Sequence, residues 1–442
     1  MRVPVEKDFT RPAHDPRVSS RVGLWLGIAF AVCFATGLLS HGIQHPPGWF
    51  DWPTRPVSLY RINQGVHVLS GVAAIPLLLA KLWSVYPLLY ARPVVRSPLH
   101  AVERGSVLVL IGAAFFQLAT GLFNVAQSYP WKFFFPAAHY AVAWIAIGSI
   151  VVHVGVKLPT IRDGLTRGLS DPAGGPGDEP AGGPARSRPE PPDEPGDGPA
   201  GGRSAPAAKR GQRAPGMTAS SRDSGNPGIR DSCDGVTSAG RAGNTGTTAL
   251  GRRGFLGAAA LASGAAVLAT AGGTVPWLRR VSVLAWTSGT GPQGLPVNRT
   301  AEAAGVRAEP GWLLELAWPG GGRLLSLEEL TAMPQHTAEL PIACVEGWSA
   351  TATWTGIPVP ALLAAVGAPR GHPVRVESME RDGLYRASTL PPGHAGDELT
   401  LLAMRVNGEQ LHLDHGFPCR IIAPSRPGVL QTKWVRRLEV LP

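Results

Sequence analysis

Cysteine is scarce in this chain of 442 residues, and the few cysteines are far apart. They stand at positions 33, 233, 344 and 419, in segments of different composition. Only Cys344 and Cys419 fall in the same predicted domain, so the spacing excludes a small fold held together by disulfides. Charged residues are also few, at 16% of the chain. The basic ones form no stripe with interleaved aromatic residues, which argues against nucleic-acid binding.

Long apolar runs, in contrast, are abundant before residue 160. Four of them approach or reach the ~20 residues that a helix needs to cross the hydrocarbon core of a bilayer. They are Val22–Leu39, Val66–Trp83, Val102–Leu122 and Pro136–Val156. A single run of this kind is compatible with a buried helix of a soluble core. Four in succession predict an all-α four-helix transmembrane bundle over residues 18–160.

Basic residues gather at one end of this predicted bundle. They are Arg17, Arg21, Arg92, Arg96, Arg104, Lys157, Arg162 and Arg167. Lysine and arginine near the ends of membrane helices are retained on the cytoplasmic side. We therefore predict a multi-pass protein of the cell membrane whose N-terminus is cytoplasmic.

Glycine and proline, with 55 and 43 residues, concentrate between residues 170 and 250. This stretch has too little apolar surface to offset the entropy of ordering it, which predicts a disordered cytoplasmic linker. A fifth apolar run, Gly254–Val275, follows directly after Arg252 and Arg253. We predict a fifth transmembrane helix within residues 251–277.

The start of the fifth run resembles a twin-arginine export signal placed inside the chain. An ordinary signal anchor with a basic flank is the alternative. The resemblance implies the twin-arginine and general secretion machinery as partners. It also implies an extracytoplasmic C-terminal domain that crosses the membrane already folded around its cofactor. Cleavage after Ala269-Thr270-Ala271, a pattern of two small residues around a central one, is a further possibility.

The last segment, residues 286–442, has the pattern of an α+β domain. The predicted strands are Trp312–Ala317, Val374–Glu377, Arg420–Ala423 and Val435–Val440, and the predicted helices are Ser326–Ala332 and Pro360–Val366. Ser326 and Glu329 have the spacing of a capping box. These patterns predict a fold class but no chemistry.

The chemistry comes from a motif that begins at Cys344. The residues CVEGWS start there, and WTGIP follows from Trp354. Together they resemble the molybdenum-ligand segment of the sulfite oxidase superfamily, in particular the branch of the periplasmic methionine sulfoxide reductase catalytic subunit. The resemblance implies that Cys344 binds molybdenum alongside molybdopterin. A soft thiolate suits a redox-active transition metal, although a lone cysteine is otherwise more often a buried apolar residue.

Two later segments resemble the pterin-binding parts of the same family. They are HGFPCR from His415 and QTKWV from Gln431. The resemblance implies a set of cofactor-binding residues, with the last three at the phosphate end: Ser378, His415, Arg420, Gln431, Thr432 and Lys433. Arginine and lysine suit phosphate, although isolated basic residues are usually solvated surface. Where family members have further pterin contacts before the cysteine, only Asn298 and Arg299 offer stand-ins.

The segment from Asp382 to Arg386 lies where family members place active-site residues. The resemblance implies that Tyr385 donates a proton near the metal and that Arg386, or Arg381, attracts an anionic substrate. An equally weighted alternative is that Asp382 and Gly383 form a hairpin turn with Tyr385 packed beside it. Cys419 stands where the family usually has an apolar residue, so we expect it in the core.

Histidines interrupt the apolar runs. His67 and His139 lie near the outer ends of the second and fourth runs, at a depth where polar groups are costly and usually functional. His153 follows His139 by 14 residues, about 21 Å of helix, and His100 is its candidate partner. The runs resemble four-helix b-type cytochromes, which implies one or two haem b groups with these histidines as iron ligands. His41 is a rival outer ligand, and simple hydrogen bonding at the membrane interface is the alternative.

The sequence thus predicts a membrane-anchored molybdopterin-dependent oxidoreductase that transfers an oxygen atom to or from a small substrate outside the cytoplasm. Haem b in the membrane bundle would exchange electrons with it and with the quinone pool or a respiratory partner. The alternative is a non-catalytic membrane receptor or assembly protein with a degenerate molybdopterin fold.

Overall fold

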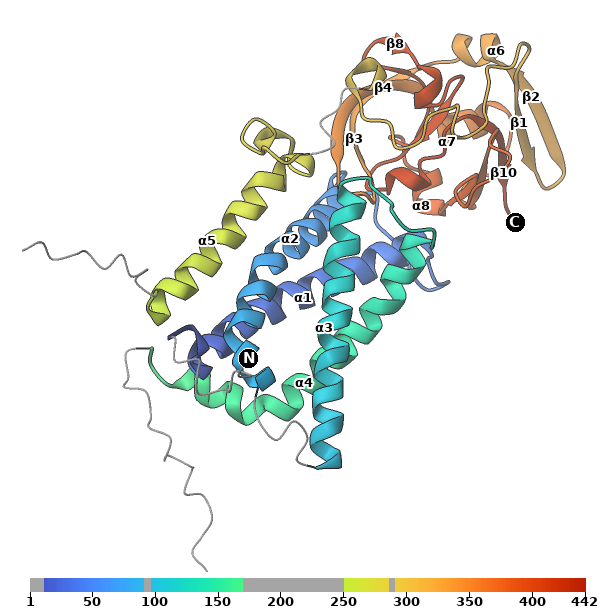
Figure 1. Ribbon diagram of the computed structural model, residues 1–442. Helices are drawn as coiled ribbons and strands as arrows, with labels where there is room; N and C mark the ends of the chain where they lie inside the picture. The colour runs from blue at the N-terminus through green and yellow to red at the C-terminus, as the bar shows by residue number, and fades with distance from the viewer. Residues whose placement is uncertain (1–11, 91–96, 170–249, 286–290) are drawn as a thin grey trace, which may run out of the picture. The chain divides into compact units, whose positions relative to one another are not determined.

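The computed structural model describes residues 12–90, 97–169, 250–285 and 291–442. The predicted linker, Cys233, Arg92 and Arg96 lie outside these residues. Within the described part, five helices are long and apolar enough to cross a membrane. They are α1 (Pro16–Gln44), α2 (Leu59–Val85), α3 (Pro98–Val125), α4 (Phe135–Thr166) and α5 (Arg252–Thr270), shown in Figure 1. Each extends beyond at least one end of the apolar run that predicted it.

These five helices form a helical region, the name used below. Helix α1 packs against α2 and α4, α3 packs against α4 and α2, and α5 packs against α2. Asp15 caps the N-terminus of α1 by accepting a hydrogen bond from the Arg17 amide, and it also pairs with Arg252 at 2.7 Å. The first residue of the double-arginine pair therefore holds the start of α5 against the start of α1.

The C-terminal part contains two five-stranded sheets (Figure 1). The first has the order β2-β1-β10-β5-β6, and its strands are β1 (Leu313–Trp318), β2 (Gly321–Ser326), β5 (Val374–Ser378), β6 (Ala387–Leu390) and β10 (Val435–Val440). Only β1 and β10 pair in parallel. The second sheet has the order β3-β4-β7-β8 with β9 also on β7, and its strands are β3 (His336–Ala343), β4 (Ser349–Pro358), β7 (Leu401–Val406), β8 (Glu409–Gln410) and β9 (Arg420–Ile422).

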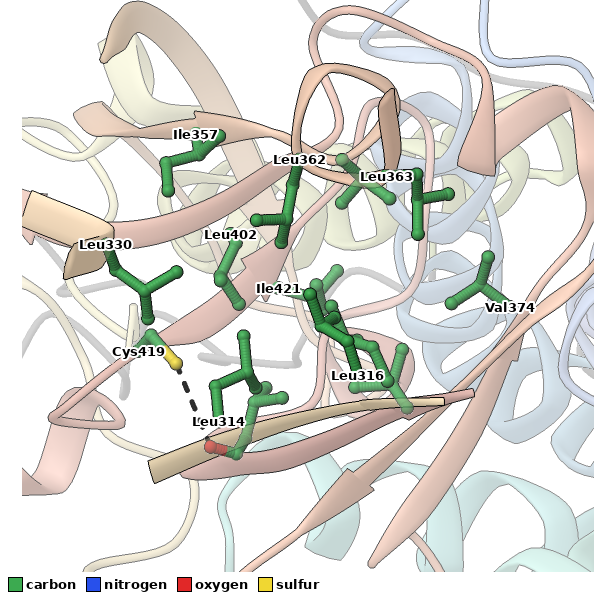
Figure 2. Close-up of a cluster of buried hydrophobic side chains, with 14 of the residues drawn as sticks. Leu314, Leu316, Leu330, Ile357, Leu362, Leu363, Val374, Leu402, Cys419 and Ile421 are labelled. Carbon is green, nitrogen blue, oxygen red and sulfur yellow. Dashed lines mark hydrogen bonds between the residues drawn. The ribbon is translucent and has the colours of Figure 1, made fainter. Parts of the chain in front are cut away.

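Side chains from both sheets meet in one hydrophobic core. Figure 2 shows Leu314 and Leu316 of β1 facing Leu402 and Ile421 of the second sheet, and Cys419 lies among them. The Cys419 thiol donates a hydrogen bond to the Val435 carbonyl at 3.8 Å, drawn as a dashed line in Figure 2. Its place in the core agrees with the expectation that it is not a metal ligand.

Three short helices, α6 (Leu327–Ala332), α7 (Val359–Ala365) and α8 (Pro392–Ala395), join the strands. The predicted capping box at the start of α6 is confirmed, because Ser326 and Glu329 bond each other's backbone amides. All four predicted strands are present within two residues of their expected bounds. The pairs β1–β2 and β3–β4, along with β6, β7 and β8, were not anticipated by the sequence patterns.

Candidate functional site

Cys344 lies on the short loop that joins β3 to β4, and it is only 2% exposed. The loop is closed by two backbone hydrogen bonds, from the Cys344 amide to the Trp348 carbonyl and from the Gly347 amide back to the Cys344 carbonyl. Gly347 adopts a φ of +92°, a conformation that side chains rarely adopt. The sequence thus folds into a turn that holds one buried thiol in a fixed place.

The surroundings of this thiol disfavour a free thiolate. Burial, and the nearby carboxylate of Glu346, raise the pKa of Cys344 well above its ordinary value. The thiol itself lies 3.5 Å from Glu346 Oε2. A buried thiolate needs a positive charge beside it, and a bound metal cation would supply that charge. The donor set therefore fits a metal that takes a single protein ligand.

Three of the predicted pterin contacts converge on one small cavity of ≈ 10 Å³. His415, Arg420 and Lys433 line it, together with Asn298 from the front of the domain. Arg420 is 3% exposed and lies 5.2 Å from the centre of the Trp354 ring. Its terminal nitrogens bond the carbonyls of His415 and Gln431, but no described residue accepts a hydrogen bond from its Nε.

Lys433 is the centre of this cluster. Its ammonium donates to the Arg299 carbonyl at 2.5 Å, the Asp414 carbonyl at 3.0 Å and the Asn298 side chain at 3.3 Å. Burial, with the charge of Arg420 as a second cause, lowers the pKa of Lys433 to about 7. The two proposed stand-ins, Asn298 and Arg299, therefore both meet Lys433. Lys433 is half-buried and its three ammonium protons all have acceptors, so Arg420 Nε is the cationic donor of this cluster that has no acceptor among the described residues.

The remaining predicted contacts are occupied by the protein itself. Ser378 donates to the Lys433 carbonyl at 2.8 Å, and Thr432 bonds the Ser388 hydroxyl at 2.8 Å. The Gln431 amide nitrogen donates to the Arg426 carbonyl, while its buried Oε1 has no hydrogen-bond partner among the described residues. None of these three side chains lines the small cavity. Their residues position Lys433 and the neighbouring backbone instead.

The small cavity fits a pterin by its chemistry but not by its volume. A space of ≈ 10 Å³ holds about one water molecule. The unpartnered Arg420 Nε and Gln431 Oε1 are the kind of buried polar atoms that a cofactor satisfies. Binding the pterin would require the segment Leu295–Asn298, which lines this cavity, to move outward.

Tyr385 and Arg386 lie on the loop that joins the antiparallel strands β5 and β6. Asp382 and Gly383 lie on the same loop, as the hairpin alternative predicted. Arg386 is exposed and donates to the Arg381 carbonyl at 3.4 Å. Tyr385 is half-buried, and its hydroxyl donates to Gln44 Oε1 at the end of α1. Burial raises the pKa of Tyr385, so this hydroxyl keeps its proton. The segment is thus a hairpin loop, and its Tyr385 lines a cavity. The catalytic roles of Tyr385 and Arg386 stay predictions.

That cavity has a volume of ≈ 530 Å³ and is lined by side chains of α1, α2, α3 and α4. His67 and His139 both face it, with ring centres 6.4 Å apart. Two imidazoles on opposite sides of one metal place their ring centres roughly 6 Å apart, since each metal–nitrogen bond is about 2 Å. The two rings therefore have the separation that a shared iron requires.

Hydrogen bonds fix the orientation of both rings. His67 Nδ1 lies 2.9 Å from the Cys33 carbonyl, and His139 Nδ1 lies 3.1 Å from the Thr120 hydroxyl. Metal-bound histidines use their second nitrogen in this way, which leaves Nε2 for the metal. A Cβ added at Gly37 would lie 2.9 Å from the His67 ring, so the glycine makes room for that ring.

The other histidines are placed differently. His41 lines the same cavity, but its ring stacks on Tyr140 at 3.8 Å. His100 and His153 do not line the cavity. Both lie within electrostatic reach of Glu103, which pairs with Lys157. Both haems, the outer one at His67 and His139 and the inner one at His100 and His153, stay predictions.

The structure also shows residues that the sequence did not single out. Val345 and Glu346 line the larger cavity beside Tyr385. Gln64 and Asn124, at the ends of α2 and α3, donate to the Val345 carbonyl at 2.9 and 3.3 Å. Amide side chains inside apolar helices were the only available signal, because polar groups at such positions are costly.

Residues 311–442 match the family described as oxidoreductase molybdopterin binding domain. Mitochondrial sulfite oxidase of Rattus norvegicus is 31% identical over 153 residues, which cover 28% of this chain and 27% of that protein. The putative protein-methionine-sulfoxide reductase subunit YedZ1 of Azospira oryzae is 31% identical over 144 residues, covering 32% of this chain and 51% of that protein. The chain thus spans about half or less of the length of these curated relatives.

One solved structure, the sulfane dehydrogenase SoxCD from Paracoccus pantotrophus, is also similar, with 23% identity and a TM-score of 0.28. The overlap covers 30% of this chain and 40% of that chain. This overlap is too limited to support a functional argument.

Proposed function

Starting from the molybdopterin-binding oxidoreductase domain of the sulfite oxidase type that residues 311–442 form, we propose a membrane-anchored oxidoreductase. It transfers an oxygen atom to or from a small substrate outside the cytoplasm. It exchanges electrons with haem b held by His67 and His139, and through it with the quinone pool or a respiratory partner. Helices α1 to α4 form the transmembrane bundle, and α5 is the fifth span.

One observation carries this proposal: a single cavity is lined by the candidate haem histidines and by the residues that follow Cys344 in the loop. His67 and His139 of the helical region line it, and so do Val345, Glu346 and Tyr385 of the C-terminal domain. Val345 is the immediate neighbour of Cys344. A volume of ≈ 530 Å³ lies within the range of cofactor pockets. Two redox sites that share a wall are suited to exchanging electrons.

The chain's own residues have separable roles in this proposal. When bound, the molybdenum cofactor supplies two-electron oxygen-atom chemistry, whereas a haem carries one electron at a time. Cys344 holds the metal. Arg420 would contact the cofactor through its Nε, which has no acceptor among the described residues, and Lys433 would meet the phosphate end as a point charge. Tyr385 holds a proton at its hydroxyl oxygen, on the side of the cavity that the C-terminal domain lines.

Location and export follow from the arrangement of the basic residues. The start of α5 carries Arg252 and Arg253, and the first turns of α1 carry Arg17 and Arg21. With these ends on the cytoplasmic side, the C-terminal domain is extracytoplasmic. Twin-arginine transport, which carries folded proteins, would export it with its cofactor in place.

A non-catalytic receptor or assembly protein is the second candidate, and the small cavity favours it. The ≈ 10 Å³ between His415, Arg420 and Lys433 holds no pterin as the side chains lie. A domain that stayed closed in this way would keep the fold without the cofactor. Measurement of molybdenum and pterin fluorescence in the purified protein separates the two candidates.

Replacement of the metal ligand tests the proposed function. Cys344→Ser should abolish turnover while leaving the haem absorption spectrum intact, because Cys344 is the proposed molybdenum ligand and lies outside the histidine pair. Cys419→Ala is the matched control, since Cys419 is also buried but lies in the core. It should retain turnover and molybdenum content. Turnover that survives Cys344→Ser would contradict the assignment.

A further inference from the structure

Two amide side chains from different helices meet at one carbonyl oxygen of the Cys344 loop. Gln64 of α2 donates to the Val345 carbonyl at 2.9 Å, and Asn124 of α3 donates to it at 3.3 Å. Gln64 is 6% exposed and Asn124 is 9% exposed. A carbonyl oxygen has two lone pairs, so side chains of the helical region take up both acceptor positions of the Val345 carbonyl.

Tyrosine and serine hydroxyls fix the direction of both amides. The Gln64 side-chain oxygen accepts from Ser40 at 3.4 Å and from Tyr60 at 3.5 Å. The Asn124 side-chain oxygen accepts from the Tyr129 hydroxyl at 3.0 Å. Because an amide oxygen only accepts and its nitrogen only donates, these bonds turn both nitrogens toward Val345.

The loop also approaches α2 so closely that only glycine fits. A Cβ added at Gly347 would lie 2.8 Å from the Val68 side chain, too close for any real contact. On the α3 side, Gln127 donates to Glu346 Oε2 at 2.6 Å. The Cys344 loop is therefore held from both sides along its length.

Helical spacing connects these contacts to the histidine pair. Gln64 precedes His67 by three residues on α2, and Asn124 follows Thr120 by four on α3. Residues three or four apart share one face of a helix. Thr120 is the residue whose hydroxyl meets His139 Nδ1. Each amide thus lies one helical turn from a residue that is, or that orients, a candidate haem ligand.

We propose that Gln64 and Asn124 are positioning residues that fix the Cys344 loop against the histidine pair, so that electrons cross at the Val345 carbonyl. This inference rests on the proposed function and assigns its electron-transfer junction to the contact between the Cys344 loop and helices α2 and α3. In the reductive direction, one substrate oxygen, two protons and two electrons form water, and a quinol that is oxidised to quinone supplies both electrons. The electrons cross singly, twice for each substrate. In the oxidative direction the same balance runs in reverse.

The test compares Gln64→Leu with Arg55→Gln in the full chain extracted in detergent. Arg55 forms an ion pair with Asp397 at 3.1 Å, which also joins the helical region to the domain but does not involve the Cys344 loop. Gln64→Leu should slow electron exchange between haem and substrate about tenfold, the size of effect seen when groups behind metal ligands are lost. Turnover with a soluble dye that reaches the domain directly should change less than about twofold. Arg55→Gln should change neither rate.

Hydrogen exchange provides a readout that needs no cofactor. The amides of Cys344 and Gly347, both bonded within the loop, should exchange faster in Gln64→Leu than in the unsubstituted chain. Equal losses in haem-coupled and dye-driven turnover, or unchanged exchange of this loop, would overturn the positioning role. Absence of molybdenum and haem from the unsubstituted protein would instead overturn the proposed function, and the exchange comparison would still decide the role of Gln64.

Discussion

The interiors of the helical region and of the C-terminal domain are built in opposite ways. In the domain, the fully buried side chains are mainly leucines, such as Leu314 and Leu402. In the helices, large apolar side chains point outward, with Leu108 and Val151 each 65% exposed. The buried positions there include polar residues: Ser40, Asn63, Gln64, Gln117, Thr120 and Asn124.

Because of this contrast, buried polar side chains mark the candidate functional positions of the helical region. Lipid solvates apolar side chains, so a membrane helix gains little by burying them, and a polar group placed inside has a specific partner. Here the partners are the candidate haem ligands and the Cys344 loop. Gln117 bonds the His139 carbonyl, Thr120 bonds its ring and Asn124 bonds Val345. In the domain, by contrast, the buried charged side chains are the arginines Arg420 and Arg426, which are 3% and 6% exposed.

The largest effect is expected from substitutions in the polar interior of the helices. His67→Ala and His139→Ala should each abolish the absorption of the proposed outer b-type haem, because each removes one of its two proposed iron ligands. His100→Ala should leave the outer haem in place. Pyridine haemochrome analysis of membranes from each variant measures the bound haem. Full haem content in His67→Ala would transfer the ligand role to another histidine of the cavity, such as His41.

A smaller effect concerns the apolar interior of the domain. Leu316→Ala should lower the stability of the domain by about 2–5 kcal/mol, because it leaves a cavity in a core that does not collapse fully. Leu108→Ala, on the exposed face of α3, leaves no such cavity and should change stability by less than about 0.5 kcal/mol. Thermal unfolding followed by tryptophan fluorescence in detergent compares the two. Equal losses would show that the outward face of α3 is packed against protein.

The smallest effect is a dependence on pH that belongs to the domain. Burial lowers the pKa of His394, which is 1% exposed, to about 4. Above pH 6.5 the His394 ring is neutral in both the folded and the unfolded protein, so it contributes no pH dependence to the stability. As the pH falls from 6.5 to 4, the unfolded state binds the proton first, so the domain loses up to about 3 kcal/mol. His415 has a similarly lowered pKa, so His394→Gln should remove about half of the combined loss.

Thermal unfolding between pH 7 and pH 4 measures this loss. His372→Gln serves as the control, because His372 is exposed on the same domain. A pH profile that His394→Gln leaves unchanged would place the acid-sensitive groups elsewhere in the protein.

The sequence predicted elements whose cause is local. Apolar runs of spanning length predicted all five long helices, and Ser326 with Glu329 predicted the start of α6. Strands β3 and β4 were not predicted from the sequence, because they are stabilised by pairing with each other and not by a local pattern. Strand β3 contains Pro341, which normally argues against a strand interior, and its pairing with β4 compensates for it.

The candidate site was partly predictable for the same reason. Motifs identified Cys344, Arg420 and Lys433, and the depth of His67 and His139 within the apolar runs singled out these two histidines. The bond between Gln64 and Val345 joins residues 281 positions apart, and no motif or period spans that distance. Only the fold brings the loop that carries Cys344 to the cavity of the histidine pair.

Metal, pterin and haem quantification on the detergent-extracted chain, together with its absorption spectrum, tests the central claim most directly. We expect molybdenum and pterin in equal amounts, and a b-type haem spectrum, from the same purified protein. A preparation that is fully folded but contains neither molybdenum nor pterin fluorescence would contradict it and favour the non-catalytic receptor.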